Sequence, residues 1–259
     1  MSDQRRLAGF FLGQRPYLPC LALQERLHAA RAAGSVDDTV LFVEHPAVIT
    51  FGRGAHAEHL LASAEELAQL GVEVVHTGRG GDVTLHAPGQ LVCYPVLNLA
   101  PDRKDVRRYV KDLAEVMRRV ALKHGVDSGL IDEHVGLWTN RGSPAAFLGT
   151  ASGSDLAKLG AIGVRISRWV TMHGFALNLT TQLQLYSRIV PCGIRQYGVT
   201  SLCELTQGRS APSVAEAAFQ AFTALISVLG ADAERSSFAV GEPPATISTL
   251  PNGVRSDAP

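Results

Sequence analysis

The chain has 259 residues with 24 basic and 24 acidic side chains, so its formal net charge is zero. This balance argues against bulk electrostatic binding to nucleic acid. Hydrophobic residues make up 46% of the chain and charged residues 19%. That composition is typical of a globular protein with a buried core and excludes a disordered chain.

The four cysteines show no CxxC spacing, so they predict neither a disulfide framework nor a zinc site. The sequence has no run of about 18 consecutive apolar residues. Its first residues also lack the apolar segment of a signal peptide. We therefore expect a cytoplasmic protein.

Start and stop signals and apolar periodicity define the expected elements. The helices at 63–70 and 213–229 both begin with the Ser-x-x-Glu spacing of a capping box. In chain order, we expect a helix at 18–33, strands at 39–44 and 47–51, a helix at 63–70, strands at 72–76, 82–86 and 91–97, a helix at 102–124, strands at 135–139, 161–166 and 169–173, and a helix at 213–229.

The strands do not alternate one by one with helices, which favours an α+β protein. We expect a single domain with a mixed, largely antiparallel β-sheet flanked by helices. This domain spans 1–240, and the Pro-rich polar stretch at 241–259 is predicted to be a flexible C-terminal tail. The Gly- and Ser-rich stretch at 140–155 is predicted to be a long flexible loop.

The segment TGRGGDVTLHAPGQLVCYP at 77–95 contains paired glycines, which let backbone N–H groups approach a ligand closely. Arg79 offers a fork of donors for a carbonyl or phosphate. Thr84 and His86 are two residues apart and share one strand face. A glycine turn in a hairpin with a surface arginine explains the same pattern. The segment is neither a P-loop nor a dinucleotide-binding fingerprint.

Lys158 differs from the other three lysines, which lie in the charged helix at 102–124. It precedes the apolar stretch LGAIGVRISRWVTMHGFALNL, so we expect it at the edge of a buried strand. A lysine snorkelling from a strand end is the alternative. His173, followed by Gly174, is compatible with a satisfied core or hairpin histidine as well as with a catalytic one.

Cys192 lies between Pro191 and Gly193, in a forced turn that can expose its sulfur in a pocket. The other three cysteines lie in apolar patterns typical of small buried side chains. Cys192 is therefore the best candidate nucleophile, and Lys158 is the lysine placed to favour its thiolate. His56 and His59 form an HxxH pair, interpreted as two surface histidines because no further zinc ligands are evident.

Taken in order, these segments resemble the octanoyltransferase family of lipoic acid biosynthesis. The resemblance rests on RGGDVTLHAPGQLVCYP at 79–95, KLGAIGVRISRWVTMHGFALNL at 158–179 and IVPCG at 189–193. VEHPAVITFGR at 43–53 fits the family's early strand region, and the match covers most of 15–205. The chain departs from the family in its longer loop at 140–155 and in Gln182, where the family often has Asp.

The resemblance implies the fold of lipoate and biotin protein ligase catalytic domains. It also implies an octanoyl transfer from octanoyl-acyl carrier protein to a lysine of lipoyl domains of 2-oxoacid dehydrogenases and of the glycine cleavage H protein. The family's nucleophile falls on Cys192, its partner lysine on Lys158, and His173 has a supporting place. The resemblance implies no cofactor, no metal and no nucleic acid or membrane partner, and we expect a monomer.

The family's substrate-contacting stretches fall on Arg79, Gly80, Gly81, Asp82, Val83, Thr84, Leu85, His86, Ala161, Ile162, Gly163, Gly174, Phe175 and Ala176. Acyl transfer through a thioester on Cys192 divides one transfer into two easier ones, with Lys158 as the base that deprotonates the acceptor amine. Backbone N–H groups near Gly80, Gly81 or Cys192 are candidates for holding the oxyanion.

Two other readings are open. An ATP-dependent lipoate or biotin ligase on the same fold would activate a free acid and would not need Cys192. A binding module that kept the scaffold without catalysis would have no use for Cys192, Lys158, Arg79 and His86 together.

Overall fold

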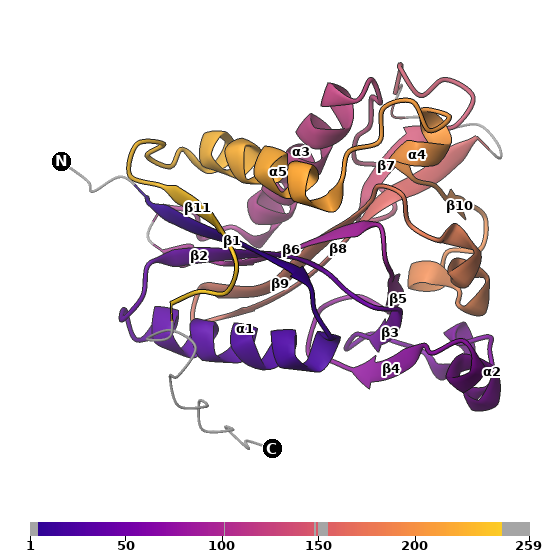
Figure 1. The fold of residues 1–259 in the computed structure, drawn as a ribbon, viewed down its shortest axis with the longest axis horizontal. Coiled ribbons are helices and arrows are strands. Elements are labelled where there is room, and N and C mark those ends of the chain that lie inside the picture. Colours follow the sequence, from indigo (N-terminus) through magenta and orange to yellow (C-terminus); the bar gives the residue numbers. More distant parts are fainter. Residues whose placement is uncertain (1–4, 101, 148, 150–154, 245–259) are drawn as a thin grey trace.

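A mixed eight-stranded sheet forms the centre of the protein (Figure 1). The computed structural model describes residues 5–100, 102–147, 149 and 155–244. Along the sheet the order is β10-β8-β9-β6-β2-β1-β11, and β7 pairs with β8. These strands are β1 (Leu7–Gln14), β2 (Asp38–Glu44), β6 (Gln90–Val96), β7 (Leu137–Asn140), β8 (Leu156–Ser167), β9 (Val170–Asn178), β10 (Gly198–Val199) and β11 (Ser237–Val240).

A second sheet of three strands lies beside the large one and carries the glycine-rich segment at its end (Figure 1). Its order is β4 (Glu73–His76), β3 (Val48–Phe51) and β5 (Val83–His86). The strand β3 runs parallel to β4 and antiparallel to β5. The short helix α2 (Ala64–Gln69) covers this sheet, and Ser63 caps it by accepting a hydrogen bond from the Glu66 N–H.

Helices cover both faces of the large sheet (Figure 1). On one face lie α3 (Val106–Lys123) and α5 (Val214–Leu229), and on the other lies α1 (Tyr17–Ala32). Asp105 caps α3, and a complete capping box of Ser213 and Glu216 begins α5. The remaining short helices are α4 (Leu202–Leu205), η1 (Ala57–His59), η2 (Leu183–Arg188) and η3 (Pro191–Gly193).

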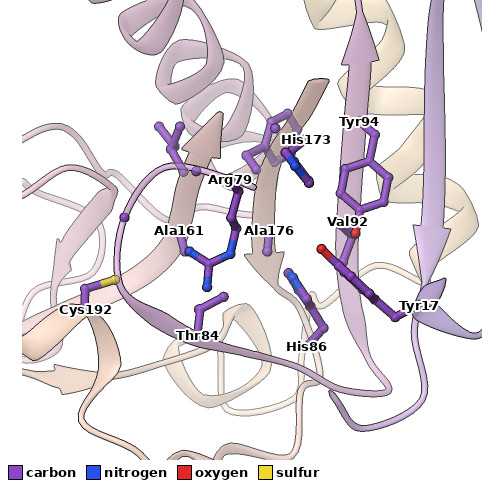
Figure 2. Close-up of a pocket in the computed structure, with 15 residues that line it drawn as sticks. Tyr17, Arg79, Thr84, His86, Val92, Tyr94, Ala161, His173, Ala176 and Cys192 are labelled. Atoms are coloured by element: carbon purple, nitrogen blue, oxygen red, sulfur yellow. The ribbon is translucent and has the colours of Figure 1, made fainter. Parts of the chain in front are cut away.

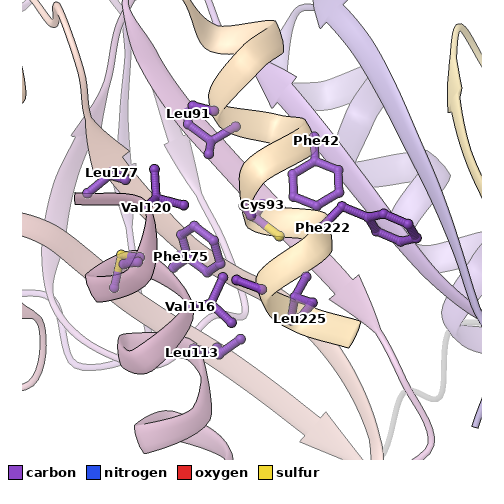
Figure 3. Close-up of a cluster of buried hydrophobic side chains, with 14 of the residues drawn as sticks. Phe42, Leu91, Cys93, Leu113, Val116, Val120, Phe175, Leu177, Phe222 and Leu225 are labelled. Carbon is purple, nitrogen blue, oxygen red and sulfur yellow. The ribbon is translucent and has the colours of Figure 1, made fainter. Parts of the chain in front are cut away.

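The largest hydrophobic core lies between the sheet and the pair α3 and α5 (Figure 3). The helices contribute side chains such as Val116 and Phe222, which pack against Phe42, Cys93 and Phe175 of the strands. These side chains are almost completely removed from water. Their burial is the main favourable contribution to holding the helices on this face. A second core joins α1 to the opposite face of the sheet.

The predicted α+β class and mixed sheet are confirmed. Five of the nine strand pairings in the described residues are antiparallel. The sequence analysis missed β1, β10 and β11, and it placed the start of α3 at 102, whereas the Asp105 cap begins the helix at Val106.

In the tail predicted for 241–259, residues 245–259 lie outside the described residues, as do 148 and 150–154 of the loop predicted for 140–155. No described helix is long and apolar enough to span a bilayer.

Candidate active site

Cys192 lies in a tight turn at η3, where the chain takes an unusual backbone conformation. Its φ of 55° is in the left-handed region, which is uncommon for a residue with a side chain. The next residue, Gly193, also has a positive φ, of 71°. The predicted forced turn is thus present. It leaves the Cys192 thiol half-buried, whereas Cys20 and Cys93 are buried.

Lys158 lies inside β8 and not at its edge, and it is only 5% exposed. Its Nζ donates a hydrogen bond to Cys192 Sγ over 3.2 Å. The same nitrogen lies 5.5 Å from the centre of the Trp138 ring on the neighbouring strand β7. The snorkelling alternative is therefore wrong, because the amine points to a thiol inside the protein.

A largely apolar cavity opens beside Cys192 (Figure 2). The empty space between its lining residues is about 450 Å³, a figure that includes the part open to solvent. Cys192 lies at one end, whereas Tyr17, His86 and Tyr94 lie toward the other (Figure 2). Ten residues of the predicted substrate-contacting stretches line this cavity: Arg79, Gly81, Thr84, His86, Ala161, Ile162, Gly163, Gly174, Phe175 and Ala176.

The small residues of β8 and β9 make room for this cavity. Ala161 and Ala176 face each other across the two strands, and Gly163 faces Gly174. A β-carbon added to Gly174 would collide with the carbonyl oxygen of Cys93 on β6. The glycine therefore allows the close approach of two central strands on which the cavity wall depends.

The remaining four residues of the predicted stretches, Gly80, Asp82, Val83 and Leu85, do not line the cavity. Val83 and Leu85 alternate with Thr84 and point into the core of the small sheet, where both are fully buried. The Gly80 N–H donates to the carbonyl of Val164 over 3.0 Å, so it is not free for an oxyanion.

Arg79 is a structural part of the cavity wall. It is 6% exposed, which contradicts the alternative of a surface arginine. Its Nε and Nη2 donate to the Thr50 hydroxyl, Nη2 also donates to the Thr50 carbonyl over 2.5 Å, and Nη1 donates to the Gly80 carbonyl. Because a guanidinium has five N–H groups, only one is left for a ligand. Burial lowers the Arg79 pKa, and the nearby Tyr17 opposes that shift.

Hydrogen-bonded aromatic side chains form the far end of the cavity. His86 contacts the Gln90 amide oxygen through Nδ1 over 2.8 Å and stacks on the Tyr17 ring. His45 Nε2 lies 2.9 Å from the hydroxyl of Tyr94. Burial lowers the pKa of His45 to about 4 and of His86 to about 3. The sequence analysis did not identify Tyr17, Tyr94 or His45, which no local motif links to the cavity.

His173 lines the same cavity with both ring nitrogens unpartnered by any described group. It is 2% exposed and has a φ of 60°, and its backbone N–H donates a hydrogen bond to Gln24 Oε1. Burial, followed by the positive charges of Arg79 and Arg165, lowers its pKa to about 3. His173 is therefore neutral in the folded protein and is not a satisfied core histidine.

A smaller cavity of about 240 Å³ lies on the Lys158 side of Cys192. Its lining includes Cys192, Lys158, Asn178 and Tyr186. Cys192 thus lies between an apolar cavity and a more polar one. A group bound in either cavity could therefore reach the Cys192 sulfur.

The two histidines of the HxxH pair lie edge-to-face, with ring centres 5.4 Å apart, but differ in burial. His56 has a side chain that is 65% exposed, as expected for a surface histidine. His59 is largely buried, and its Nδ1 lies 2.5 Å from Asp82 Oδ2, so the surface interpretation is wrong for this residue. No group of three or more His, Cys, Asp or Glu in the described ranges is arranged to hold a metal ion.

Comparison of the chain with known proteins identifies its family. The lipoyl protein ligase A/B catalytic domain matches residues 16–223. An octanoyltransferase of Solibacter usitatus is 41% identical over 205 residues, covering 79% of this chain and 86% of that protein. An octanoyltransferase of Myxococcus xanthus is 44% identical over 78% of this chain, but this chain spans only 54% of its length.

Solved structures show the same fold at low identity. A bi-partite lipoate protein ligase of Thermoplasma acidophilum has a TM-score of 0.67 at 14% identity, covering 95% of this chain and 90% of that one. Lipoate-protein ligase A bound with ATP has a TM-score of 0.68 at 15% identity, with 96% and 92% covered. Given the family match and the 41% identity to a full-length relative, the chain belongs to the lipoyl protein ligase A/B catalytic domain family and, within it, to the octanoyltransferases.

Proposed function

We propose that this octanoyltransferase carries the octanoyl group as a thioester on Cys192, between octanoyl-acyl carrier protein as donor and a lipoyl-domain lysine as acceptor. The observation that carries the proposal is the 3.2 Å contact between Lys158 Nζ and Cys192 Sγ beside the apolar cavity. A thiolate is the reactive form of cysteine, and a neighbouring ammonium favours it.

In the first step, the Cys192 thiolate attacks the carbonyl carbon of the donor thioester. A new carbon–sulfur bond forms, and the bond to the carrier's sulfur breaks. The Lys158 ammonium gives its proton to the leaving thiolate and becomes a neutral amine. The octanoyl chain occupies the cavity lined by Ala161 and Ala176.

In the second step, the acceptor amine attacks the carbonyl carbon of acyl-Cys192. An amide bond forms, and Cys192 leaves as a thiolate. Neutral Lys158 takes the proton from the attacking nitrogen, which restores the starting ion pair. The smaller cavity beside Lys158 supports the role of Lys158 as the base, because it offers the acceptor amine a second approach to the Cys192 sulfur.

The proposal also covers the domain bounds, the oligomeric state, the acceptor proteins and the cellular location. We propose residues 1–240 as the catalytic domain and a monomer as the working form. Lipoyl domains of 2-oxoacid dehydrogenases and the glycine cleavage H protein are the proposed acceptors. All four cysteines are free thiols, which supports a cytoplasmic location.

Intact-protein mass spectrometry after incubation with octanoyl-acyl carrier protein tests the thioester. The wild type should gain one octanoyl adduct that hydroxylamine removes and that an added lipoyl domain accepts. Cys192→Ser should gain none, whereas Cys203→Ser, which changes another half-buried free thiol, should behave as the wild type. An adduct on Cys192→Ser would refute the mechanism.

A second arm addresses the ligase reading. The enzyme is mixed with free octanoate, ATP and a lipoyl domain, without acyl carrier protein. Octanoylation of the domain under these conditions would favour a ligase that activates a free acid. No product here, together with transfer from the carrier protein, supports the thioester route.

A further inference from the structure

The Cys192 turn, residues 190–194, holds its nucleophile in a conformation that the chain does not prefer by itself. Two consecutive residues, Cys192 and Gly193, have positive φ values, and this region is unfavourable for an L-residue such as cysteine. Within the turn, the Gly193 N–H donates to the Val190 carbonyl over 3.1 Å. Such local bonds alone are a weak restraint on the turn, so contacts from outside the turn are needed to hold it.

The segment at η1 supplies several of these outside contacts. The Val190 N–H donates to the His59 carbonyl over 2.7 Å, and Leu60 forms a bridge with Ile189. A β-carbon added to Gly193 would lie 3.0 Å from His59 Cε1 and 3.3 Å from Asp82 Oδ2. The His59 ring and the Asp82 carboxylate therefore pack directly against the residue that follows the nucleophile.

Asp82 fixes the orientation of that ring. Its Oδ2 lies 2.5 Å from His59 Nδ1, and its Oδ1 accepts a hydrogen bond from the His56 N–H over 3.1 Å. Both side chains are largely removed from water, with 17% of His59 and 12% of Asp82 exposed. Asp82 directly precedes β5, whose Thr84 lines the apolar cavity.

We propose that His59 and Asp82 are a positioning pair. They hold the Cys192 turn against the cavity wall, so that Cys192 Sγ stays within hydrogen-bond distance of Lys158 Nζ. Neither side chain lines the cavity, so the pair acts through the turn and not on the substrate. The inference rests on the proposed role of Cys192. It predicts that loss of the pair lowers the reactivity of the thiol more than it lowers substrate binding.

Four variants separate this role from general destabilisation. His59→Phe keeps a ring against Gly193 but removes the Nδ1 contact, and Asp82→Ala removes the carboxylate. Asp82→Asn keeps the size and one acceptor oxygen, so it is the conservative variant. The matched control is His56→Phe, which changes an exposed histidine of the same segment but keeps its backbone N–H and an aromatic ring beside His59.

Two readouts are used on the full-length enzyme. The first is the rate of Cys192 alkylation by iodoacetamide at neutral pH, followed by peptide mass spectrometry so that Cys203 is counted separately. The second is kcat and KM for transfer from octanoyl-acyl carrier protein. Urea midpoints of all variants identify any that are unfolded under assay conditions.

His59→Phe and Asp82→Ala should slow alkylation and lower kcat by about tenfold, equivalent to about 1.4 kcal/mol, with KM for the carrier protein unchanged. Asp82→Asn should recover most of the rate, and His56→Phe should match the wild type. If His59→Phe does not fold, the comparison of Asp82→Ala with Asp82→Asn decides.

Alkylation of His59→Phe at the wild-type rate, or equal loss in Asp82→Asn and Asp82→Ala, would overturn the proposal. The alkylation arm needs no acyl substrate. If the wild type forms no octanoyl adduct, the proposed function fails, yet the positioning role is still decided by the alkylation rates.

Discussion

Acidification is expected to destabilise the protein through the histidines around the cavity. Burial lowers the pKa of His45 to about 4 and the pKa values of His86 and His173 to about 3, whereas unfolding restores each to about 6.5. Between these values the unfolded chain binds more protons than the folded one. The stability that the neutral histidines maintain is therefore complete above about pH 6.5 and is lost as the pH falls through the window to about 3.

The size of the loss follows from proton linkage. On going from about pH 7 to about pH 5, each histidine is protonated in the unfolded chain and stays neutral in the folded one, which costs about 2 kcal/mol. The three together cost up to about 6 kcal/mol, a large share of the usual stability of about 5–15 kcal/mol for a domain. His28, whose pKa burial also lowers, acts in the same direction.

Urea unfolding at the two pH values measures this loss directly. The variant His173→Asn removes one titrating ring at a position with positive φ, where asparagine is well tolerated. Its loss of stability between about pH 7 and 5 should be smaller by about 2 kcal/mol. The exposed His56→Phe should leave the loss unchanged. A wild-type stability that is equal at both pH values would refute the view that these rings are held neutral by burial.

Two further substitutions follow from the geometry. Lys158→Met keeps a stem beside Trp138 but removes the amine, so transfer should slow by about 10²–10⁴-fold, which rapid-quench kinetics would measure. A wild-type rate would exclude Lys158 as the base. Gly174→Ala should lower the free energy of unfolding by about 1–3 kcal/mol because its β-carbon meets the Cys93 carbonyl. Gly54→Ala, whose β-carbon has its nearest neighbour at 3.5 Å, is the control, and equal urea midpoints for the two variants would contradict the predicted clash.

Local signals located α1, α2, α3 and α5, but not the short helix α4 and not every strand. Ser63 and Ser213 marked helix starts because their side chains satisfy free N–H groups within one turn, whereas the Asp105 cap of α3 was not recognised. The strand β1 has no such marker. It pairs in parallel with β2 and with β11, more than 200 residues away, and this pairing is set by tertiary packing.

The residues of the candidate site that could be predicted are those that lie in a short contiguous motif. Alternation along β5 correctly placed Thr84 and His86 on one face, but the same alternation turns Leu85 into the core, so only part of the predicted segment lines the cavity. Tyr17 and Tyr94 come from α1 and β6 and meet only in the folded protein. Nothing in the spacing of such distant residues indicates that they share a cavity.

The burial of Lys158 explains how one side chain serves both steps of the proposed cycle. In the described part of the chain no carboxylate forms an ion pair with Lys158, and its Nζ contacts Cys192 Sγ, so in the proposed cycle the Cys192 thiolate is the counter-charge. Acylation of Cys192 converts that thiolate into a neutral thioester. In the proposed cycle Lys158 gives its proton to the leaving thiolate of the carrier protein at this step, so no unpaired charge is left buried. The resulting amine takes the proton of the incoming lysine as the Cys192 thiolate leaves, so the two opposite charges reappear together.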